Sequence, residues 1–116
     1  MSLDKFFIRE TLTIKDSLAA ISKSGYNTIF VADSNGKLKG SLTDGDIRRA
    51  LLTNATTLTK ITNIYNKNPK YLIKDNYVDK DVKKIFAEEK INVIPVLDNN
   101  SKIYKIINWE DHFLNK

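Results

Sequence analysis

Two stretches of this sequence decide the fold, because one is a copy of the other. The first, Asn27 to Asp46, reads NTIFVADSNGKLKGSLTDGD, and the second, Asn92 to Asp111, reads NVIPVLDNNSKIYKIINWED. Seven of the 20 aligned positions are identical, whereas composition alone predicts roughly one or two matches. Each copy is too small to bury a good core alone, so the two copies are expected to pack on each other. Equivalent clefts then lie between the halves, and a functional site is expected there.

The composition is that of an ordinary globular chain. With 116 residues, 41% of them hydrophobic, the chain can form one compact unit with a real core. It contains no apolar run near 18 residues and no secretory signal layout at its start. The absence of cysteine excludes a disulfide framework and a thiolate metal site. These features favour a cytoplasmic location and no membrane partner.

The net charge of +5 raises the question of nucleic-acid binding. The lysines are scattered along the chain, and aromatic residues do not recur beside them as a stacking platform requires. We therefore predict a solvated lysine-rich surface and no nucleic-acid partner. The basic balance still suits a pocket for an anionic small molecule.

Hydrophobic periodicity predicts the elements of the first half. They are a short strand or extended segment at Leu12–Ile14, a helix at Lys15–Ser24, a strand at Thr28–Ala32, a turn at Asp33–Gly36, a strand at Lys37–Leu42 and a helix from Thr43 to near Asn54. In the first helix, Leu18 and Ile21 are expected to face the core. Asp16 or Ser17 is expected to cap its start, and Gly25 to end it.

The second half repeats this order after a polar connector. Its elements are an extended segment at Tyr71–Ile73, a helix at Tyr77–Lys90, a strand at Asn92–Leu97, a turn at Asp98–Ser101, a strand at Lys102–Ile107 and a short helix from Trp109. The inward positions of its first helix are Val78, Val82, Ile85 and Phe86. Leu18 and Ile21 then match Val82 and Ile85 at an offset of 64 positions, whereas the strands of the two copies match at an offset of 65. The sequence predicts an α+β fold of two β-α-β-β-α units, residues 1–58 and 59–116.

The chemistry of the first half is concentrated where its second strand ends, in GSLTDGDIRRALL from Gly40 to Leu52. One interpretation is structural, because Thr43 or Asp44 can cap the helix and Asp46 suits its positive end. The other is functional. An open helix N-terminus attracts phosphate, and a carboxylate on its first turn can accept hydrogen bonds from ribose hydroxyls. Arg48 and Arg49 add guanidinium groups that suit phosphate, so the set matches a nucleotide.

The doubled pattern resembles a tandem pair of cystathionine β-synthase (CBS) domains, from Phe7 to Phe113. IFVADSNGKLKGSLTDGDIRRAL fits the strand, turn, strand and Ser/Thr-x-x-Asp pattern of the family, and VIPVLDNNSKIYKIINWEDHF fits it again. The resemblance implies a non-catalytic module regulated by AMP, ADP, ATP or S-adenosylmethionine, in which the motif carboxylate holds the ribose. TDGDIRRALL also resembles CBS pairs attached to bacterial sugar-phosphate nucleotidyltransferases. This narrower resemblance implies that the enzyme regulated, whether fused or a partner, is a sugar-phosphate nucleotidyltransferase.

The resemblance implies two sites of unequal quality. The first comprises Tyr26, Asn27, Thr28, Thr43, Asp44, Asp46, Arg48 and Arg49. The second, weaker site comprises Ile91, Asn92, Val93, Asn108 and Asp111. It is weaker because Asn108 replaces the hydroxyl residue, Glu110 adds negative charge, and no arginine follows.

Other sites are disfavoured. We predict no metal site at Asp44 and Asp46, because two helix-start carboxylates rarely hold a cation alone. The single histidine, His112, has no second imidazole or cysteine to share a metal, and we assign it and Trp109 to packing. No nucleophile and base pair suggests an enzyme. Apolar helix surface around Ile47, Leu51 and Ile85 permits a homodimer, and the alternative function is a scaffold that oligomerises a parent enzyme and binds no ligand.

Overall fold

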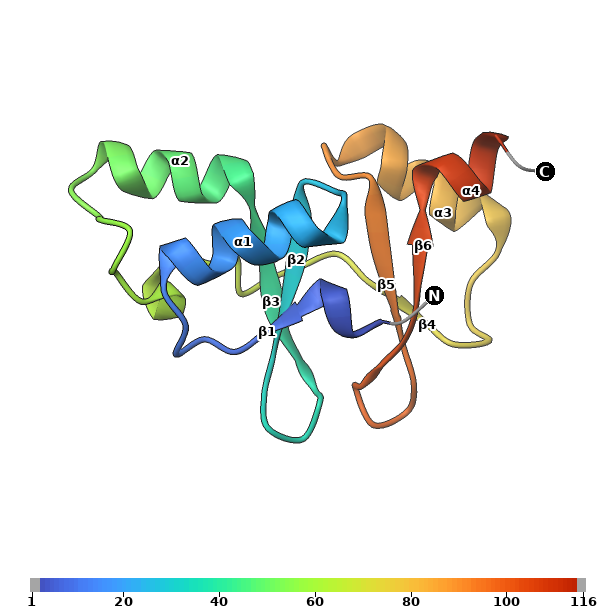
Figure 1. Ribbon diagram of the computed structural model, residues 1–116. Helices are drawn as coiled ribbons and strands as arrows, with labels where there is room; N and C mark the ends of the chain where they lie inside the picture. The colour runs from blue at the N-terminus through green and yellow to red at the C-terminus, as the bar shows by residue number, and fades with distance from the viewer. Residues whose placement is uncertain (1–2, 115–116) are drawn as a thin grey trace.

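The computed structural model describes residues 3–114 and has two halves with the same order of elements (Figure 1). The first half contains η1 Asp4–Phe6, β1 Phe7–Ile8, α1 Ile14–Ser24, β2 Thr28–Ala32, β3 Leu38–Thr43 and α2 Asp44–Leu52. After η2 Ile61–Asn63, the second half contains β4 Leu72–Ile73, α3 Asp79–Glu88, β5 Val93–Leu97, β6 Ile103–Asn108 and α4 Trp109–Leu114. The predicted β-α-β-β-α repeat and the α+β class are confirmed. Residues 1–2 and 115–116, the outer ends of the predicted units, lie outside the described range.

Each half has one three-stranded sheet, in the order β1-β2-β3 or β4-β5-β6. The first pair of strands is parallel and the second antiparallel in both sheets. The hairpin turns are alike as well. Asp33 Oδ1 accepts hydrogen bonds from the backbone N–H groups of Asn35 and Lys37, and Asp98 Oδ1 accepts the equivalent two. Gly36 has a positive φ of 81°, and Ser101 takes the same place with a φ of 63°.

The central strands β2 and β5 are buried on both faces. Because successive side chains of a strand point to opposite faces, Ile29 and Val31 pack in the core of the first half, while Phe30 packs with Val93 and Phe6 between the halves. The second half has its own smaller cluster around Val82. Within residues 3–114, three apolar clusters hold the fold together. The cluster of Phe6, Phe30 and Val93 is shared by both halves.

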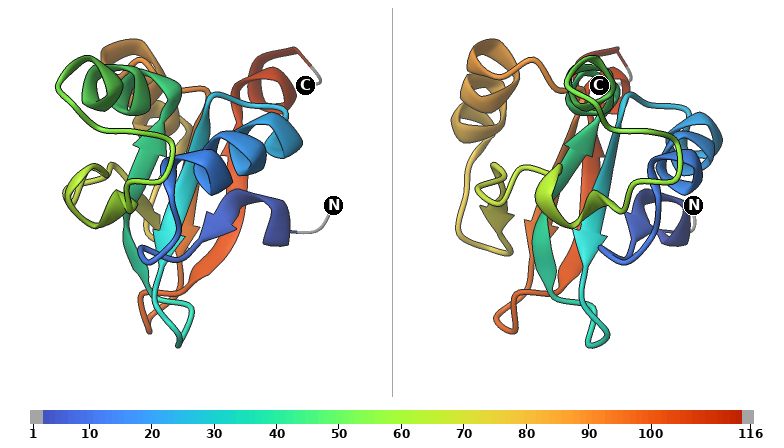
Figure 2. Two further views of the ribbon diagram at one scale, coloured as in Figure 1. Left: turned by 60° about the vertical axis from the view of Figure 1, so that its left-hand side comes forward. Right: turned by 90° about the vertical axis from the view of Figure 1, so that its left-hand side faces the viewer.

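The two sheets stand side by side, and both hairpins project in the same direction (Figure 1). The Leu38 N–H donates a 3.0 Å hydrogen bond to the Ser101 carbonyl, which joins the hairpins directly. Helices α1 and α3 lie on opposite sides of the paired sheets (Figure 2).

The connector packs on the first half. Ile61 and Tyr65 belong to its core cluster, and the backbones of Ser41 and Asn66 exchange two hydrogen bonds. Gly40 permits this crossing, because a Cβ there would overlap the Asn66 carbonyl and the Tyr65 ring. Connector residues beyond the predicted division at 58/59 thus complete the first core, and the division itself stays a prediction.

Several details of the first half differ from the sequence prediction. The first strand is Phe7–Ile8, whereas in the predicted segment at Leu12–Ile14 Thr13 forms an isolated bridge with Lys60 and Ile14 already begins α1. Ser17 is buried in α1, and Leu18 is 39% exposed. The Ser17 hydroxyl donates to the Thr13 carbonyl at 2.9 Å, so burial leaves no hydroxyl unpaired. The helices therefore keep the offset of 65, with Ser17 opposite Val82, and the predicted offset of 64 was wrong.

Two burial assignments fail, one predicted buried and one predicted exposed. Val78 precedes α3 as its N-cap residue and is exposed, because the helix begins one residue later. Ile47, expected on an exposed helix face, is buried in the first core. The predicted packing role of His112 is confirmed, since its ring contacts Phe113 with centroids 4.9 Å apart and its Nε2 lies 2.7 Å from Asp79 Oδ1.

Candidate functional site

The start of α2 is organised by a reciprocal cap. The Thr43 hydroxyl accepts the Asp46 N–H at 3.1 Å, and Asp46 Oδ2 accepts the Thr43 N–H at 2.9 Å. The second carboxylate oxygen of Asp46 accepts a hydrogen bond from Arg49 Nη2 at 2.7 Å. The structural interpretation of the motif is therefore correct, and it also fixes a carboxylate, a hydroxyl and a guanidinium on the first turn of α2.

Both arginines of the motif reach back toward this turn. A Cβ placed on Gly45 would lie 3.3 Å from Arg49 Nη1 and 3.8 Å from Arg48 Nη2. Since the first backbone N–H groups of a helix carry positive partial charge, the two guanidiniums increase the attraction of this opening for an anion. The Asp44 side chain is exposed beside them, and its N–H donates to the Asn27 carbonyl at 3.1 Å.

A hollow of about 370 Å³ lies beside Asp46, which we call the α2 hollow. It is lined by Asp46, Arg49, Ala50, Thr53, Ala55, Thr59, Asn63 and Ile64. The connector residues in this set were not part of the sequence prediction. Nothing local in the sequence indicates them, because the connector reaches α2 only through the tertiary fold.

The start of α4 repeats the cap with different atoms. The Asn108 side chain donates to Asp111 Oδ2 and accepts from the Asp111 N–H, both at 2.7 Å. The Trp109 N–H donates to the Asn92 carbonyl at 2.9 Å, as Asp44 does to Asn27. The α4 opening carries two carboxylates, Glu110 and Asp111, and no arginine, whereas two guanidiniums balance the two carboxylates Asp44 and Asp46 at the α2 opening.

A second, smaller hollow lies where the halves meet, and we call it the interface hollow. Its volume is about 60 Å³, and it is lined by Thr28, Phe30, Ser41, Asn66, Lys70, Glu89, Ile91 and Val93. Thr28 was predicted for the first site, whereas Ile91 and Val93 were predicted for the second. The structure brings these three together. Ser41, Asn66, Lys70 and Glu89 were missed.

Tyr26 was predicted for the first site, but its side chain lies beside residues of the second. Burial raises the pKa of Tyr26, and the carboxylates of Glu110 and Asp111 raise it further. The side chain of Tyr26 therefore lies near the carboxylates at the start of α4. Asn27 and Thr28 do remain beside the α2 opening, because Thr28 pairs with Thr43 across the sheet. The interface hollow and the surroundings of the Tyr26 side chain thus combine residues of both halves.

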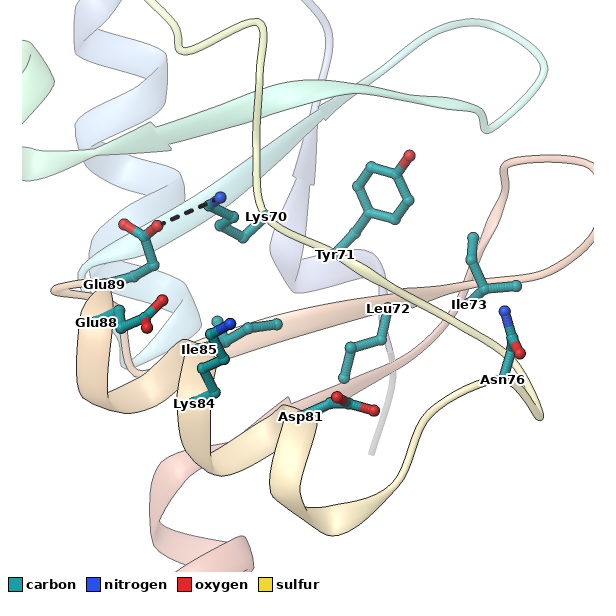
Figure 3. Close-up of a pocket in the computed structure, with 10 residues that line it drawn as sticks. All are labelled: Lys70, Tyr71, Leu72, Ile73, Asn76, Asp81, Lys84, Ile85, Glu88 and Glu89. Atoms are coloured by element: carbon teal, nitrogen blue, oxygen red, sulfur yellow. Dashed lines mark ion pairs between the residues drawn. The ribbon is translucent and has the colours of Figure 1, made fainter.

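The surface also has two larger grooves, which lie at equivalent places in the two halves. The α3 groove, about 460 Å³, lies between β4 and α3 and includes Leu72, Ile73 and Asp81 (Figure 3). The α1 groove, about 620 Å³, includes Phe7, Ile8 and Asp16, which are the same positions shifted by 65. The repeat therefore extends to the surface, although the charged residues that line the two grooves differ.

Within residues 3–114, no group of three or more His, Cys, Asp or Glu side chains is placed to hold a metal ion. None of the helices in the described part of the chain has the length and apolar character needed to cross a membrane.

Comparison with known proteins agrees with this geometry. Residues 1–53 match the family model of the CBS domain. The arabinose 5-phosphate isomerase GutQ of Escherichia coli is 28% identical over 103 residues, which are 89% of this chain and 32% of that protein. The chain therefore spans about a third of the length of this relative.

Solved structures match both halves at once. The CBS domain pair of protein MJ0100, in complex with 5′-methylthioadenosine and S-adenosyl-L-methionine, superposes with a TM-score of 0.75 at 26% identity, covering 91% of this chain and 86% of that one. The chain folds as a CBS-domain pair. A CBS domain protein of Pyrobaculum aerophilum complexed with AMP has the same fold, with a TM-score of 0.75 at 17% identity over 90% of this chain and 80% of that one.

Within this fold, the predicted ligand residues fall into two groups. Thr43, Asp44, Asp46, Arg48, Arg49, Asn27 and Thr28 gather around the α2 opening, and Asn108, Asp111, Asn92 and Tyr26 gather around the α4 opening. Ile91 and Val93 lie in the interface hollow with Thr28.

Proposed function

We propose that this CBS-domain pair binds an adenine nucleotide between its halves and thereby regulates a fused or partner enzyme. One observation carries the proposal. At the α2 opening, a carboxylate and a hydroxyl meet two guanidiniums that reach back over the helix N-terminus. Such a set offers acceptors to a ribose and positive charge to a phosphate.

The proposed roles follow the positions of the groups. Asp46 accepts the ribose hydroxyls, and Arg49 turns from Asp46 toward the phosphate when the ligand binds. This exchange costs little, because the Arg49 side chain is 71% exposed and exposed ion pairs are weak. Arg48 adds a second cation. The base lies toward Asn27, Thr28 and the interface hollow, since Thr28 both pairs with Thr43 and lines that hollow.

The second site, with Asn108, Asp111, Asn92, Ile91 and Val93, is proposed as the weaker one. Glu110 and Asp111 repel a phosphate at the α4 opening, and no cation stands in the places of Arg48 and Arg49. Among AMP, ADP, ATP and S-adenosylmethionine, the two guanidiniums at the α2 opening favour the phosphate-bearing ligands.

The regulated enzyme is proposed to act on a sugar phosphate. The sequence resemblance favours a nucleotidyltransferase, while the relative named above is an isomerase of a sugar phosphate. Regulation requires only that the ligand binds one relative placement of the two halves more tightly, because differential affinity shifts the equilibrium. A cytoplasmic location and a homodimer remain part of this proposal.

Isothermal titration with AMP, ADP, ATP and S-adenosylmethionine tests the site. Asp46→Ala is expected to weaken the binding of AMP at least about tenfold, since it removes charge-assisted hydrogen bonds worth roughly 1.5–3 kcal/mol. Asp16→Ala is the matched control, because Thr13 and Asp16 form the same reciprocal cap at α1. It removes the same cap and is expected to leave the affinity for AMP unchanged. Equal affinity in the wild type and Asp46→Ala contradicts the assignment.

The ligand-free scaffold remains the second candidate, favoured by one observation. Large apolar side chains are exposed on α2 and α4, including Leu51, Leu52, Trp109 and Phe113, with Leu52 81% exposed. A surface of this kind is expected to pair with another chain. A dimer in sedimentation, together with no thermal stabilisation by millimolar adenine nucleotides, would favour the scaffold.

A further inference from the structure

We propose that a salt bridge between Lys70 and Glu89 closes the interface hollow, and that it opens to admit the base of the ligand. The inference rests on the proposed function, because it concerns how the base reaches Thr28 and Ile91. Lys70 follows the connector and precedes β4, and Glu89 ends α3. Their charged atoms, Lys70 Nζ and Glu89 Oε1, are 3.7 Å apart (Figure 3).

The position of the pair is the first argument. Lys70 and Glu89 line the α3 groove and also line the interface hollow. They are the two residues shared by these linings. The ion pair therefore stands at the boundary between a wide outer groove and a small inner space.

The size of the inner space is the second argument. A hollow of about 60 Å³ has room for a few water molecules, each of which occupies about 30 Å³ in the liquid. A purine needs more room than that. The adjoining groove of about 460 Å³ lies within the usual range of small-molecule pockets, roughly 300–1,000 Å³. Opening the salt bridge joins the two spaces into one cleft that leads to Thr28 and Ile91.

The weakness of the pair is the third argument. The side chains of Lys70 and Glu89 are 60% and 36% exposed, and exposed ion pairs contribute little because water and salt screen them. Such a contact holds the hollow closed without preventing its opening. It also makes the closure sensitive to salt.

The first half has no ion pair at the equivalent positions. The positions of Lys70 and Glu89 correspond to Lys5 and Ser24 at the offset of 65. The Ser24 hydroxyl donates to the Ile21 carbonyl at 2.9 Å, and Lys5 Nζ lies 5.4 Å from the centroid of the Phe6 ring. The pair thus distinguishes one cleft from its counterpart, and Lys5 provides a matched control.

Titration with adenosine, which is neutral, tests the proposal without a phosphate effect. Glu89→Gln and Lys70→Gln are each expected to tighten the binding of adenosine about two- to fivefold, the affinity equivalent of one exposed ion pair. The double variant is expected to bind no tighter than the better single variant, because both changes remove the same contact. Lys5→Gln is expected to bind as the wild type does.

Salt provides an independent measurement. Raising sodium chloride from 50 mM to 1 M is expected to bring the wild-type affinity for adenosine toward that of Glu89→Gln, since salt screens the pair only where it exists. Equal or weaker binding in either single variant, or a wild type and variants that respond identically to salt, overturns the proposal. If adenosine, AMP and ATP bind neither the wild type nor any variant, the proposed function itself fails.

Discussion

Glu10 links three segments of the first half through one carboxylate. Its Oε2 lies 2.6 Å from Lys39 Nζ and accepts a hydrogen bond from the Tyr65 hydroxyl at 3.1 Å. The Thr62 hydroxyl donates to the Glu10 backbone carbonyl at 3.1 Å. Together these bonds tie the connector to the segment after β1 and to β3. The hydrogen bond and charge of Lys39 hold the pKa of Glu10 below its ordinary value near 4.5, with help from Tyr65.

This lowered pKa predicts a pH dependence of stability. A carboxylate with a depressed folded-state pKa stabilises the fold above its unfolded-state value, and the contribution is lost as pH falls through the folded-state pKa. In urea unfolding at pH 7, the free energy of unfolding is expected to be higher for the wild type than for Glu10→Gln. The difference is expected to shrink as pH falls from about 5 toward 3. A constant difference across this range contradicts the role of the Glu10 charge.

At the scale of elements, caps of one kind begin α1 and α2. Both pair Thr with Asp three residues later, and the carboxylate of each cap lines a hollow, yet of the two helices only α2 contains arginines. The motif alone therefore indicates a helix start. The proposed nucleotide site depends in addition on Gly45, Arg48 and Arg49, which distinguish the α2 opening from that of α1.

Gly45 is expected to make α2 less stable than alanine would, and to leave room for a phosphate to approach the backbone. Gly45→Ala improves helix propensity and is expected to raise the free energy of unfolding by about 0.5 kcal/mol. The added methyl group would lie 3.3 Å from Arg49 Nη1 and 3.6 Å from the Thr43 hydroxyl. It is therefore expected to weaken AMP binding severalfold, because it blocks close approach of a phosphate to the backbone. Calorimetry and urea unfolding measure the two effects, and unchanged affinity would argue against phosphate at this turn.

At the scale of the whole molecule, the shared cluster between the sheets joins two small cores into one. Phe30 and Val93 come from opposite halves and are both buried there. The second half contributes only a small cluster of its own. The halves are therefore expected to unfold together.

Phe30→Ala measures this coupling. Loss of a buried phenyl ring is expected to lower the free energy of unfolding by about 3–5 kcal/mol, while the chain still unfolds in one transition. Leu58→Ala, at a side chain 75% exposed, serves as the control and is expected to change stability by less than about 0.5 kcal/mol. Two separate transitions in circular dichroism would show that the halves are independent.

The sequence by itself determined the repeat and the order of its elements. The strand Thr28–Ala32 was predicted with its observed bounds, because a run of apolar residues between Gly25 and the Asp33–Gly36 turn is a local signal. The start of α2 was equally local, since its cap joins residues three positions apart. Such features depend on the backbone and its nearest neighbours.

Only the tertiary structure decided which residues share a cleft. Periodicity favoured Leu18 over Ser17 as the buried residue, because it does not register that a hydroxyl bonded to its own helix can be buried without cost. Tyr26 was grouped with its own copy, yet it faces the carboxylates of the other, and Thr28 lies with Ile91 and Val93. The physical reason is that the halves pack face to face. Contacts across that interface join residues 63 to 85 positions apart, from Thr28 and Ile91 to Tyr26 and Asp111, and no local pattern records them.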